Sequence, residues 1–375
     1  MSATAQTTPE TLLETPFTDM HRSAGARIVP FAGYAMPVQY PAGIIAEHTQ
    51  CRTKAALFDV AHMGVVDLTG PERASALETL LPADVKGLVE GAQTYSFFTN
   101  PEAGILDDLM ITNLGDRLML VVNAACKEAD IAHLQATLPE SAGVAPRPDL
   151  ALLALQGPAS EAALAALAPE AAAMTFMTAR TFPIAGVECR VTRSGYTGED
   201  GYEIAIPADQ ATTVAQALLD QADVEWAGLG ARDSLRLEAG LCLYGHDIDT
   251  KTTPVEAGLV WAIAKHRRGA DAGYPGAAII AEQITNGPLR KRVGLRPDGR
   301  APAREGADLT DESEMIIGAV TSGGFGPTVG GPVAMGYVSR EHAEPGNVVN
   351  AMVRGKPLAC TVTKMPFVPR GYKRA

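Results

Sequence analysis

The chain has 375 residues, of which 46% are hydrophobic and 20% are charged, so it has room for about two or three globular domains of ~150 residues each. Its 31 Lys and Arg against 43 Asp and Glu give a net charge of -12, which disfavours nucleic acid and anionic membranes as partners. The five cysteines are scattered, odd in number and without C-x-x-C or C-x-x-H spacing. The sequence therefore predicts neither a disulfide framework nor a metal site.

No apolar run approaches the ~20 residues that a membrane-spanning helix needs. The first 16 residues, MSATAQTTPETLLETP, have neither a basic segment followed by an apolar one nor an Arg-rich amphipathic pattern. We therefore expect a soluble, cytoplasmic protein without a targeting segment.

Alternating apolar residues predict strands in the first part of the chain, with helical patterns between them. The predicted strands are residues 63–68, 118–122, 150–156, 187–192 and 202–207. The predicted helices are residues 71–81, 127–138 and 209–221, and Asp209 is a candidate N-cap for the last of them. A doubly wound dinucleotide fold is excluded, because the G-x-G of Gly228 and Gly230 lacks the third glycine and a clear preceding strand.

The sequence pattern changes after residue 281, where short apolar runs are separated by Gly- and Pro-rich turns. The predicted strands there are residues 292–295, 315–321, 333–339, 348–353 and 358–364. This pattern predicts a separate all-β barrel or sandwich, with the seam between about residues 279 and 289.

Residues 104–113 (GILDDLMITN) place two acids next to each other in a predicted strand. Successive side chains of a strand leave on opposite faces, so either Asp107 or Asp108 must point inward. A buried carboxylate costs several kcal/mol unless it has partners, so the inward residue either serves a ligand or caps backbone amides.

Residues 194–204 (SGYTGEDGYEI) gather glycines, tyrosines and acids in one turn between two strands. Such a turn suits close approach of the backbone to a flat ligand. Glu203 begins the following strand, where its two oxygens could accept paired N–H groups from a heterocycle such as a pterin. The other interpretation is a solvated hairpin rim.

Residues 230–240 (GARDSLRLEAG) form a third polar segment. Arg232 and Arg236 lie four residues apart, on one face of a helix, and Asp233 can pair with Arg236. A surface ion pair is the simplest interpretation of this pattern.

These segments together resemble the T-protein, or aminomethyltransferase, family of glycine cleavage. The resemblance runs from about residue 15 to 372 and depends on the order and number of the motifs. Besides the three segments above, it includes FAGYAMPVQY (31–40), LFDVAHM (57–63), LLALQGP (152–158), VTRSGYTGEDGYE (191–203), ARDSLRLEAGLCLYG (231–245), AMGY (334–337) and KMPFVP (364–369).

The resemblance implies an α+β fold, a cloverleaf of three domains around a central channel. Two mixed α/β domains are partly interleaved in sequence, and a β-barrel follows them. On this basis we expect a folate-binding region over residues 15–278 and a barrel over residues 285–372.

The resemblance also implies the activity: the one-carbon unit of an aminomethyl-loaded lipoyl carrier protein passes to tetrahydrofolate, giving 5,10-methylenetetrahydrofolate and ammonia. It implies Asp108 as the catalytic residue, whereas the opposite faces of the strand favour a structural role for Asp107. The implied folate-binding residues are Glu203, Arg232, Tyr196, Tyr95, Asn123 and Tyr372. Implied partners are the lipoyl carrier (H-protein), glycine decarboxylase and dihydrolipoyl dehydrogenase.

Between residues 261 and 295 there are six basic residues against two acids, Asp271 and Glu282, a local charge of +4. This basic segment could steer an acidic carrier to the channel, or it could be a solvated linker face. Its basic residues are Lys265, Arg267, Arg268, Arg290, Lys291 and Arg292.

Two other functions of the same fold remain open. One is a folate-dependent demethylase acting on a small sulfur or oxygen compound. The other is a non-catalytic folate-binding helper of iron-sulfur assembly, which resembles a Lys-Gly-Cys-Tyr-x-Gly-Gln pattern where this chain has RSGYTGE without a cysteine (193–199). Bacterial relatives often carry tyrosine at the position of Thr112, so the folate-pocket lining differs here.

Overall fold

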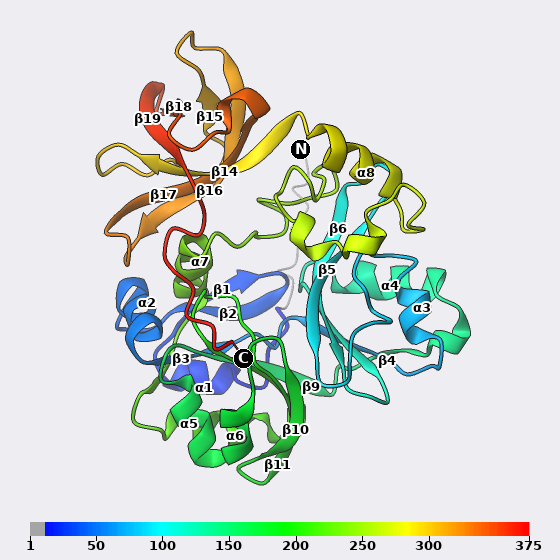
Figure 1. The fold of residues 1–375 in the computed structure, drawn as a ribbon. Coiled ribbons are helices and arrows are strands. Elements are labelled where there is room, and N and C mark those ends of the chain that lie inside the picture. The colour runs from blue at the N-terminus through cyan, green and yellow to red at the C-terminus, as the bar shows by residue number, and fades with distance from the viewer. Residues whose placement is uncertain (1–11, 375) are drawn as a thin grey trace, which may run out of the picture.

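The computed structural model describes residues 12–374. Its strands form a six-stranded sheet, a five-stranded sheet, a closed six-stranded barrel and a small hairpin. Figure 1 shows the two sheets and the barrel as three lobes, with the C-terminal segment running between them to the middle of the molecule. The α+β cloverleaf with a C-terminal barrel, expected from the resemblance, is confirmed.

The six-stranded sheet turns one face to its own helices and the other to the centre of the molecule. In β9, Leu153 and Leu155 pack with the first face, whereas Leu152 and Ala154 belong to the core cluster on the second. The period of two in this apolar run decides which side chain reaches the centre. The order of the strands is β10 (Ala179–Ile184), β11 (Val187–Thr192), β12 (Gly201–Pro207), β9 (Leu150–Gln156), β3 (Ala55–Asp59) and β13 (Val224–Trp226).

The five-stranded sheet is antiparallel, and it is inserted in sequence between β3 and β9 of the other sheet. The two lobes are therefore interleaved along the chain. The strand order is β5 (Gln93–Thr99), β6 (Ile105–Asn113), β7 (Leu118–Val122), β4 (Gly64–Leu68) and β8 (Val144–Pro146), with helices α3 (Arg73–Leu77) and α4 (Lys127–Thr137) in the same lobe.

Helix α8 (Ala277–Asn286) occupies the expected seam, and the barrel begins at residue 290. The division into residues 15–278 and 285–372 stays a prediction. The barrel closes in the order β14 (Arg290–Pro297), β17 (Gly331–Ser339), β16 (Ile316–Gly326), β15 (Asp308–Thr310), β18 (Val348–Val353) and β19 (Lys356–Thr363). The remaining elements are α1 (Thr18–Ser23), β1 (Arg27–Phe31), β2 (Tyr34–Gln39), α2 (Ile44–Thr53), α5 (Ser160–Leu167), α6 (Ala211–Leu219) and α7 (Leu229–Glu238), with six short 3₁₀ turns among residues 12–374.

The predicted strands are all present, but two expectations about helices are wrong. The helix expected over residues 71–81 is only five residues long, because the chain after Leu77 continues in a tighter turn, in which Thr79 and Leu80 donate to the carbonyl groups three residues back. Asp209 does not cap α6, since it lies inside a 3₁₀ turn and Gln210 stands at the cap. Eight strands were not predicted, and three of these have only three residues each, too few to show alternation. The eight are β1, β2, β3, β5, β8, β10, β13 and β15.

A buried ion pair joins helix α7 to the barrel. Arg236 donates to Asp247 at 2.7 Å and to the Ser322 hydroxyl of β16 at 2.9 Å. The same Asp247 accepts hydrogen bonds from Thr321 and Ser322. Asp233 also pairs with Arg236 at 2.8 Å, but its side chain is 59% exposed whereas that of Asp247 is 0% exposed. The expected pair is therefore present, yet Arg236 is an internal residue rather than a surface one.

We predict that Asp247→Ala lowers the free energy of unfolding by about 3–5 kcal/mol, because it leaves a buried guanidinium without its main counter-charge. Asp233→Ala removes the exposed partner of the same arginine and should cost about 1 kcal/mol or less. Urea unfolding of the two variants measures the difference. Equal losses would show that the buried pair does not hold α7 to the barrel.

Candidate active site

The two adjacent aspartates of β6 are held by one asparagine. Leu109 pairs with Val122 across the antiparallel strands, which places Asn123 opposite Asp108. The backbone N–H and Nδ2 of Asn123 donate to the two oxygens of Asp107 at 3.0 and 2.9 Å. Its Nδ2 also donates to Oδ1 of Asp108 at 2.9 Å. Asp107 is fully buried and Asp108 is partly buried, so the inward aspartate serves the structure and its neighbour is left to face the centre.

Asp108 has an unusual proton affinity for a carboxyl group. Burial raises its pKa from the ordinary 3.8 to about 7, and the negative charge of Asp107 acts in the same direction. Hydrogen bonds from Tyr95 and Asn123 oppose the shift. A carboxyl group that titrates near neutral pH can both accept and donate a proton under cellular conditions.

Tyr95, on the neighbouring strand β5, fixes the second oxygen of Asp108. Its hydroxyl donates to Oδ2 at 3.0 Å. The Tyr95 ring stacks on Trp261, with centroids 5.3 Å apart, and 65% of Trp261 is exposed. The aromatic pair gives the carboxylate an apolar wall that continues to the surface.

Glu203 lies on the face of β12 that is turned to the centre. Its neighbours Tyr202 and Ile204 belong to the core on the opposite face, so alternation leaves Glu203 pointing away from that core. Ser194 donates a hydrogen bond to its Oε2 at 2.8 Å. Glu203 lines a small cavity of about 10 Å³ with eight further residues: Val60, Met63, Gln93, Met119, Val121, Leu152, Thr192 and Ala205. It is therefore not part of a solvated hairpin rim.

Arg232 and Tyr196 complete the polar groups on this side of the site. The Arg232 guanidinium lies over the Tyr196 ring, 4.8 Å from its centroid, and Tyr196 donates its hydroxyl hydrogen to the carbonyl of Cys242. Nη1 of Arg232 is buried without an acceptor among residues 12–374, and burial lowers the pKa of this arginine. A buried guanidinium nitrogen without a partner is costly, which is the expected state of a group that meets a polar ligand.

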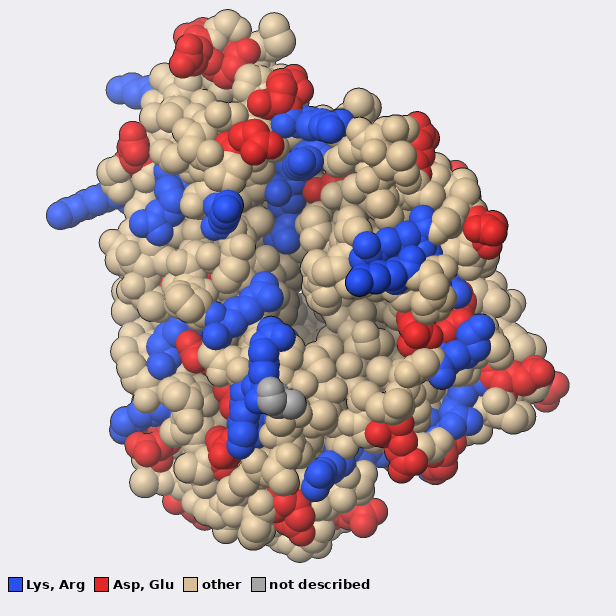
Figure 2. Space-filling view, in the orientation of Figure 1, with Lys and Arg blue, Asp and Glu red and all other residues tan. Residues whose placement is uncertain are grey.

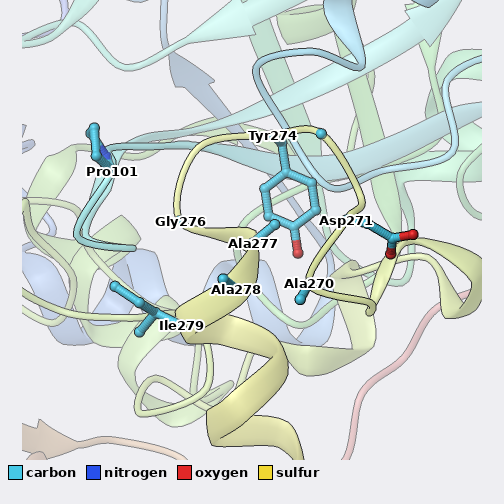
Figure 3. Close-up of a pocket in the computed structure, with 9 residues that line it drawn as sticks. Pro101, Ala270, Asp271, Tyr274, Gly276, Ala277, Ala278 and Ile279 are labelled. Atoms are coloured by element: carbon cyan, nitrogen blue, oxygen red, sulfur yellow. The ribbon is translucent and has the colours of Figure 1, made fainter.

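A larger cavity of about 330 Å³ lies elsewhere, at the start of helix α8 (Figure 3). It contains none of the residues expected in the site. Its lining is formed by Pro101, Ala270, Asp271, Gly273, Tyr274, Gly276, Ala277, Ala278 and Ile279. Within residues 12–374, no group of three or more His, Cys, Asp and Glu could hold a metal ion, and no helix is long and apolar enough to cross a membrane.

Comparisons with known proteins agree over nearly the whole chain. A family profile described as the GCVT N-terminal domain matches residues 17–267, and one described as the glycine cleavage T-protein C-terminal barrel domain matches residues 290–369. The chain belongs to the glycine cleavage T-protein family. It is 45% identical to a mitochondrial aminomethyltransferase of Dictyostelium discoideum, over 97% of this chain and 94% of that protein.

Two further relatives lead to the same family. The mitochondrial aminomethyltransferase of Gallus gallus is 45% identical, over 98% of this chain and 95% of that protein. A crystal structure of the glycine cleavage system aminomethyltransferase T from Bartonella henselae is 44% identical and matches with a TM-score of 0.91, over 97% of this chain and all of that one. The aminomethyltransferase function predicted from the sequence is thereby confirmed.

Gln93 is the site residue that sequence reasoning missed in this T-protein. It stands opposite Thr112 in the β5–β6 register and donates from Nε2 to the Thr112 hydroxyl at 3.2 Å. Its Oε1 is buried without a donor within the described residues, and the side chain lines the cavity of Glu203. In the sequence, Thr112 was the feature that could have indicated Gln93. A small residue in place of tyrosine leaves room that a neighbour on the adjacent strand can fill.

Tyr372 lies apart from the other expected site residues. Its ring stacks on Phe176, with centroids 4.0 Å apart, in the C-terminal segment that returns to the middle of the molecule (Figure 1). Among residues 12–374 it makes no hydrogen bond or aromatic contact with Asp108, Glu203 or Arg232. Its role in folate binding stays a prediction.

The basic segment expected between residues 261 and 295 is smaller than its sequence indicates. Arg267 is buried against Glu78, Arg290 pairs with Glu256 at 3.1 Å, and Arg292 donates to the carbonyl groups of Ala257 and Gly240. Four basic residues of the segment have no carboxylate partner inside residues 12–374, and two of them, Arg268 and Arg292, donate to backbone carbonyl groups; the other two are Lys265 and Lys291. Figure 2 shows Lys and Arg side chains on both sides of the hollow in the middle of the visible face.

We predict that Asp108→Asn becomes more stable relative to wild type as pH rises from about 4 to about 7. Because the pKa of Asp108 is raised to about 7, this group stabilises the fold most below its ordinary pKa of 3.8, and the contribution is lost as pH rises through the folded pKa. The uncharged amide of the variant does not titrate over this range, so it causes no loss of stability. The gain in the free energy of unfolding over wild type is at most about 1.4 kcal/mol for each unit by which the pKa of Asp108 is raised.

Chemical unfolding of both proteins across this pH range measures the gain. The control is Asp116→Asn, since the Arg117 hydrogen bond lowers the pKa of Asp116 and the gain should be missing there. A stability difference for Asp108→Asn that does not change with pH would contradict the raised pKa.

Proposed function

We propose that this aminomethyltransferase takes the aminomethyl group from a lipoyl-bearing carrier protein and gives its carbon to tetrahydrofolate, with Asp108 as the catalytic residue. The observation that carries the proposal is the position of Asp108: a partly buried carboxyl group with a pKa near 7, held by Tyr95 and Asn123 and turned to the centre of the three lobes.

The bonds that change explain why a carboxylate is needed. The carbon–sulfur bond of the aminomethyl carrier breaks with its electron pair going to sulfur, which leaves an electron-poor, iminium-like carbon. N5 of the folate bonds to that carbon, and N10 then displaces the amino group as its carbon–nitrogen bond breaks. The protons that N5 and N10 lose go to the thiolate and to the departing amine, which gives the thiol and ammonia. A carboxylate in an apolar setting stabilises the positive charge more strongly than it would in water. A pKa near 7 also lets Asp108 take and return a proton during the transfer.

The polar groups beside the small cavity have the hydrogen-bonding chemistry that the pterin ring of the folate needs. The ring presents an edge of N–H donors, for which Glu203 and the unpaired Oε1 of Gln93 are acceptors. Arg232 offers an unpaired N–H donor for the carbonyl or carboxylate oxygens of the same substrate. We assign substrate binding to these residues, with Tyr196 supporting the Arg232 guanidinium.

We predict that Asp108→Ala and Glu203→Ala fail in different ways. Asp108→Ala should lower kcat by about 10² to 10⁴, as expected for loss of a proton-transfer group, with folate affinity nearly unchanged. Glu203→Ala should raise the folate Kd by about tenfold or more, since it removes a charged acceptor worth about 1.5–3 kcal/mol. Ammonia release from aminomethyl-loaded carrier, and folate titration by calorimetry, measure the two effects.

The control for this comparison is Glu188→Ala, which changes an exposed acid on strand β11. The opposite pattern, in which Asp108→Ala loses folate binding and Glu203→Ala loses turnover, would refute the assigned roles. If the wild-type protein releases no folate-dependent ammonia from loaded carrier but demethylates a small sulfur or oxygen compound, the demethylase replaces the proposal.

The carrier would approach over the exposed basic residues beside the aromatic pair. Lys265 is exposed four residues after Trp261, whose ring stacks on Tyr95 of the site. We propose the H-protein as the partner at this surface, with glycine decarboxylase and dihydrolipoyl dehydrogenase as the enzymes that act on the same carrier. Relatives of this chain are named as mitochondrial proteins, so the cytoplasmic location stays a prediction.

We predict that Lys265→Glu raises the KM for an acidic carrier severalfold at low salt, and that the effect fades above about 0.15 M salt, where exposed charges are screened. Lys356→Glu, an equally exposed charge reversal on barrel strand β19, is the control and should change KM little. Equal effects of the two variants would show that net charge, rather than this surface, sets the carrier affinity.

A further inference from the structure

A third carboxyl group lies beside Asp107 and Asp108. Asp130 is in the first turns of helix α4 and is 3% exposed. Its Oδ2 is buried without a hydrogen-bond donor among residues 12–374, and no Lys, Arg or His in that range forms an ion pair with it. An unpaired carboxylate in such a place would cost several kcal/mol, so the group must either find a counter-charge or keep its proton.

The neighbour of Asp130 shows where a proton can go. Asp130 is in hydrogen-bonding contact with Asp107. Both oxygens of Asp107 already accept N–H groups from Asn123, which is the arrangement of an ionised carboxylate. Two carboxyl groups in contact can form a hydrogen bond only if one of them holds a proton. Because Asp107 is the acceptor on both sides, Asp130 is the donor.

We propose that Asp130 is a positioning residue: it stays protonated at neutral pH and donates its proton in a hydrogen bond to Asp107, which keeps Asp107 ionised and Asn123 fixed against Asp108. The inference rests on the proposed role of Asp108. Asp130 therefore acts on the site through hydrogen bonds: it holds Asp107, Asp107 holds Asn123, and Asn123 holds Asp108, the carboxyl group that meets the substrate.

The groups that face Asp130 support this assignment. Burial raises its pKa, and the hydrogen bond and negative charge of Asp107 and the charge of Asp108 raise it further. From its own helix it meets the Cys126 thiol, whose pKa is itself raised, and from the neighbouring loop the Tyr244 phenol. None of these four groups carries a positive charge, so nothing in this set favours ionisation of Asp130.

The first experiment observes the proton directly and needs no turnover. The infrared C=O stretch of a protonated carboxyl group is separate from the bands of carboxylates. We expect the folded wild-type protein to show such a band at pH 8.5, above the pKa of about 7 of Asp108. The band should persist in Asp108→Asn and in the control Glu128→Gln, an exposed acid in the first turn of the same helix, and it should vanish in Asp130→Asn. Its absence in wild type, or its persistence in Asp130→Asn, would overturn the proposal.

The second experiment measures the effect on the site. Asp130→Asn keeps a neutral donor toward Asp107, so kcat should stay within about twofold of wild type and the acid limb of its pH profile should not move. Asp130→Ala removes the donor and should lower kcat about tenfold with little change in folate KM, in keeping with one hydrogen bond to a charged group.

A shift of the acid limb to lower pH in Asp130→Asn would mean that a negative charge had been removed, so that Asp130 is ionised, and would overturn the proposal. Equal activity of Asp130→Ala and wild type would do the same. If Asp108 proved not to be catalytic, the infrared result would still stand, so the failure of the two proposals can be told apart.

Discussion

The site depends on the fact that two adjacent acids in one strand must leave it on opposite faces. In β6 this sends Asp107 into the lobe and Asp108 to the centre of the molecule. The buried acid is stable only because Asn123 donates two N–H groups to it. The same amide then has a fixed position from which to hold Asp108. Asp107 and the proposed catalytic residue Asp108 are therefore parts of a single arrangement, and changing the first must disturb the second.

The second constraint is the relative placement of the lobes, and buried charges provide much of it. Asp67 of the five-stranded lobe accepts hydrogen bonds from Arg117 and Arg147 of its own region and from Arg190 of the six-stranded sheet. Arg236 and Asp247 join helix α7 to the barrel. Apolar contacts can slide without a large change in energy, whereas ion pairs with several hydrogen bonds have one good geometry. Such contacts suit a site whose residues come from different lobes.

The sequence was informative where one strand or helix decides the outcome. Alternation located β7, β9 and β11 with their observed bounds, and the adjacency of Asp107 and Asp108 indicated that one of the two points inward. It failed where the answer lies in a distant segment. Arg267 is buried against Glu78, which lies 189 residues away along the chain, and this contact removes its charge from the surface where it had been placed.

The pairing of Gln93 with Thr112 shows the same limit at the site. Neither residue is unusual in its own strand, and only the β5–β6 register brings them together beside Glu203. Asp130 likewise has the appearance of an ordinary acid in the first turn of a helix, where it would favour the helix dipole. Spatial proximity to Asp107 alone gives it another role. The role of a residue that acts through a partner is hard to predict from a single sequence, because it depends on which residue the fold places beside it.

The buried polar groups without partners indicate that stability and function depend on different parts of the fold. Gln93 Oε1 and Arg232 Nη1 are buried without a hydrogen-bond partner inside residues 12–374, and Asp130 Oδ2 is buried there without a donor. Such groups lower stability, and the raised pKa of Asp108 adds a cost when this carboxyl group ionises. The three lobes each have an apolar core of their own that does not include these groups. Stability therefore comes from the lobes, which leaves the residues between them free to be arranged for binding and proton transfer.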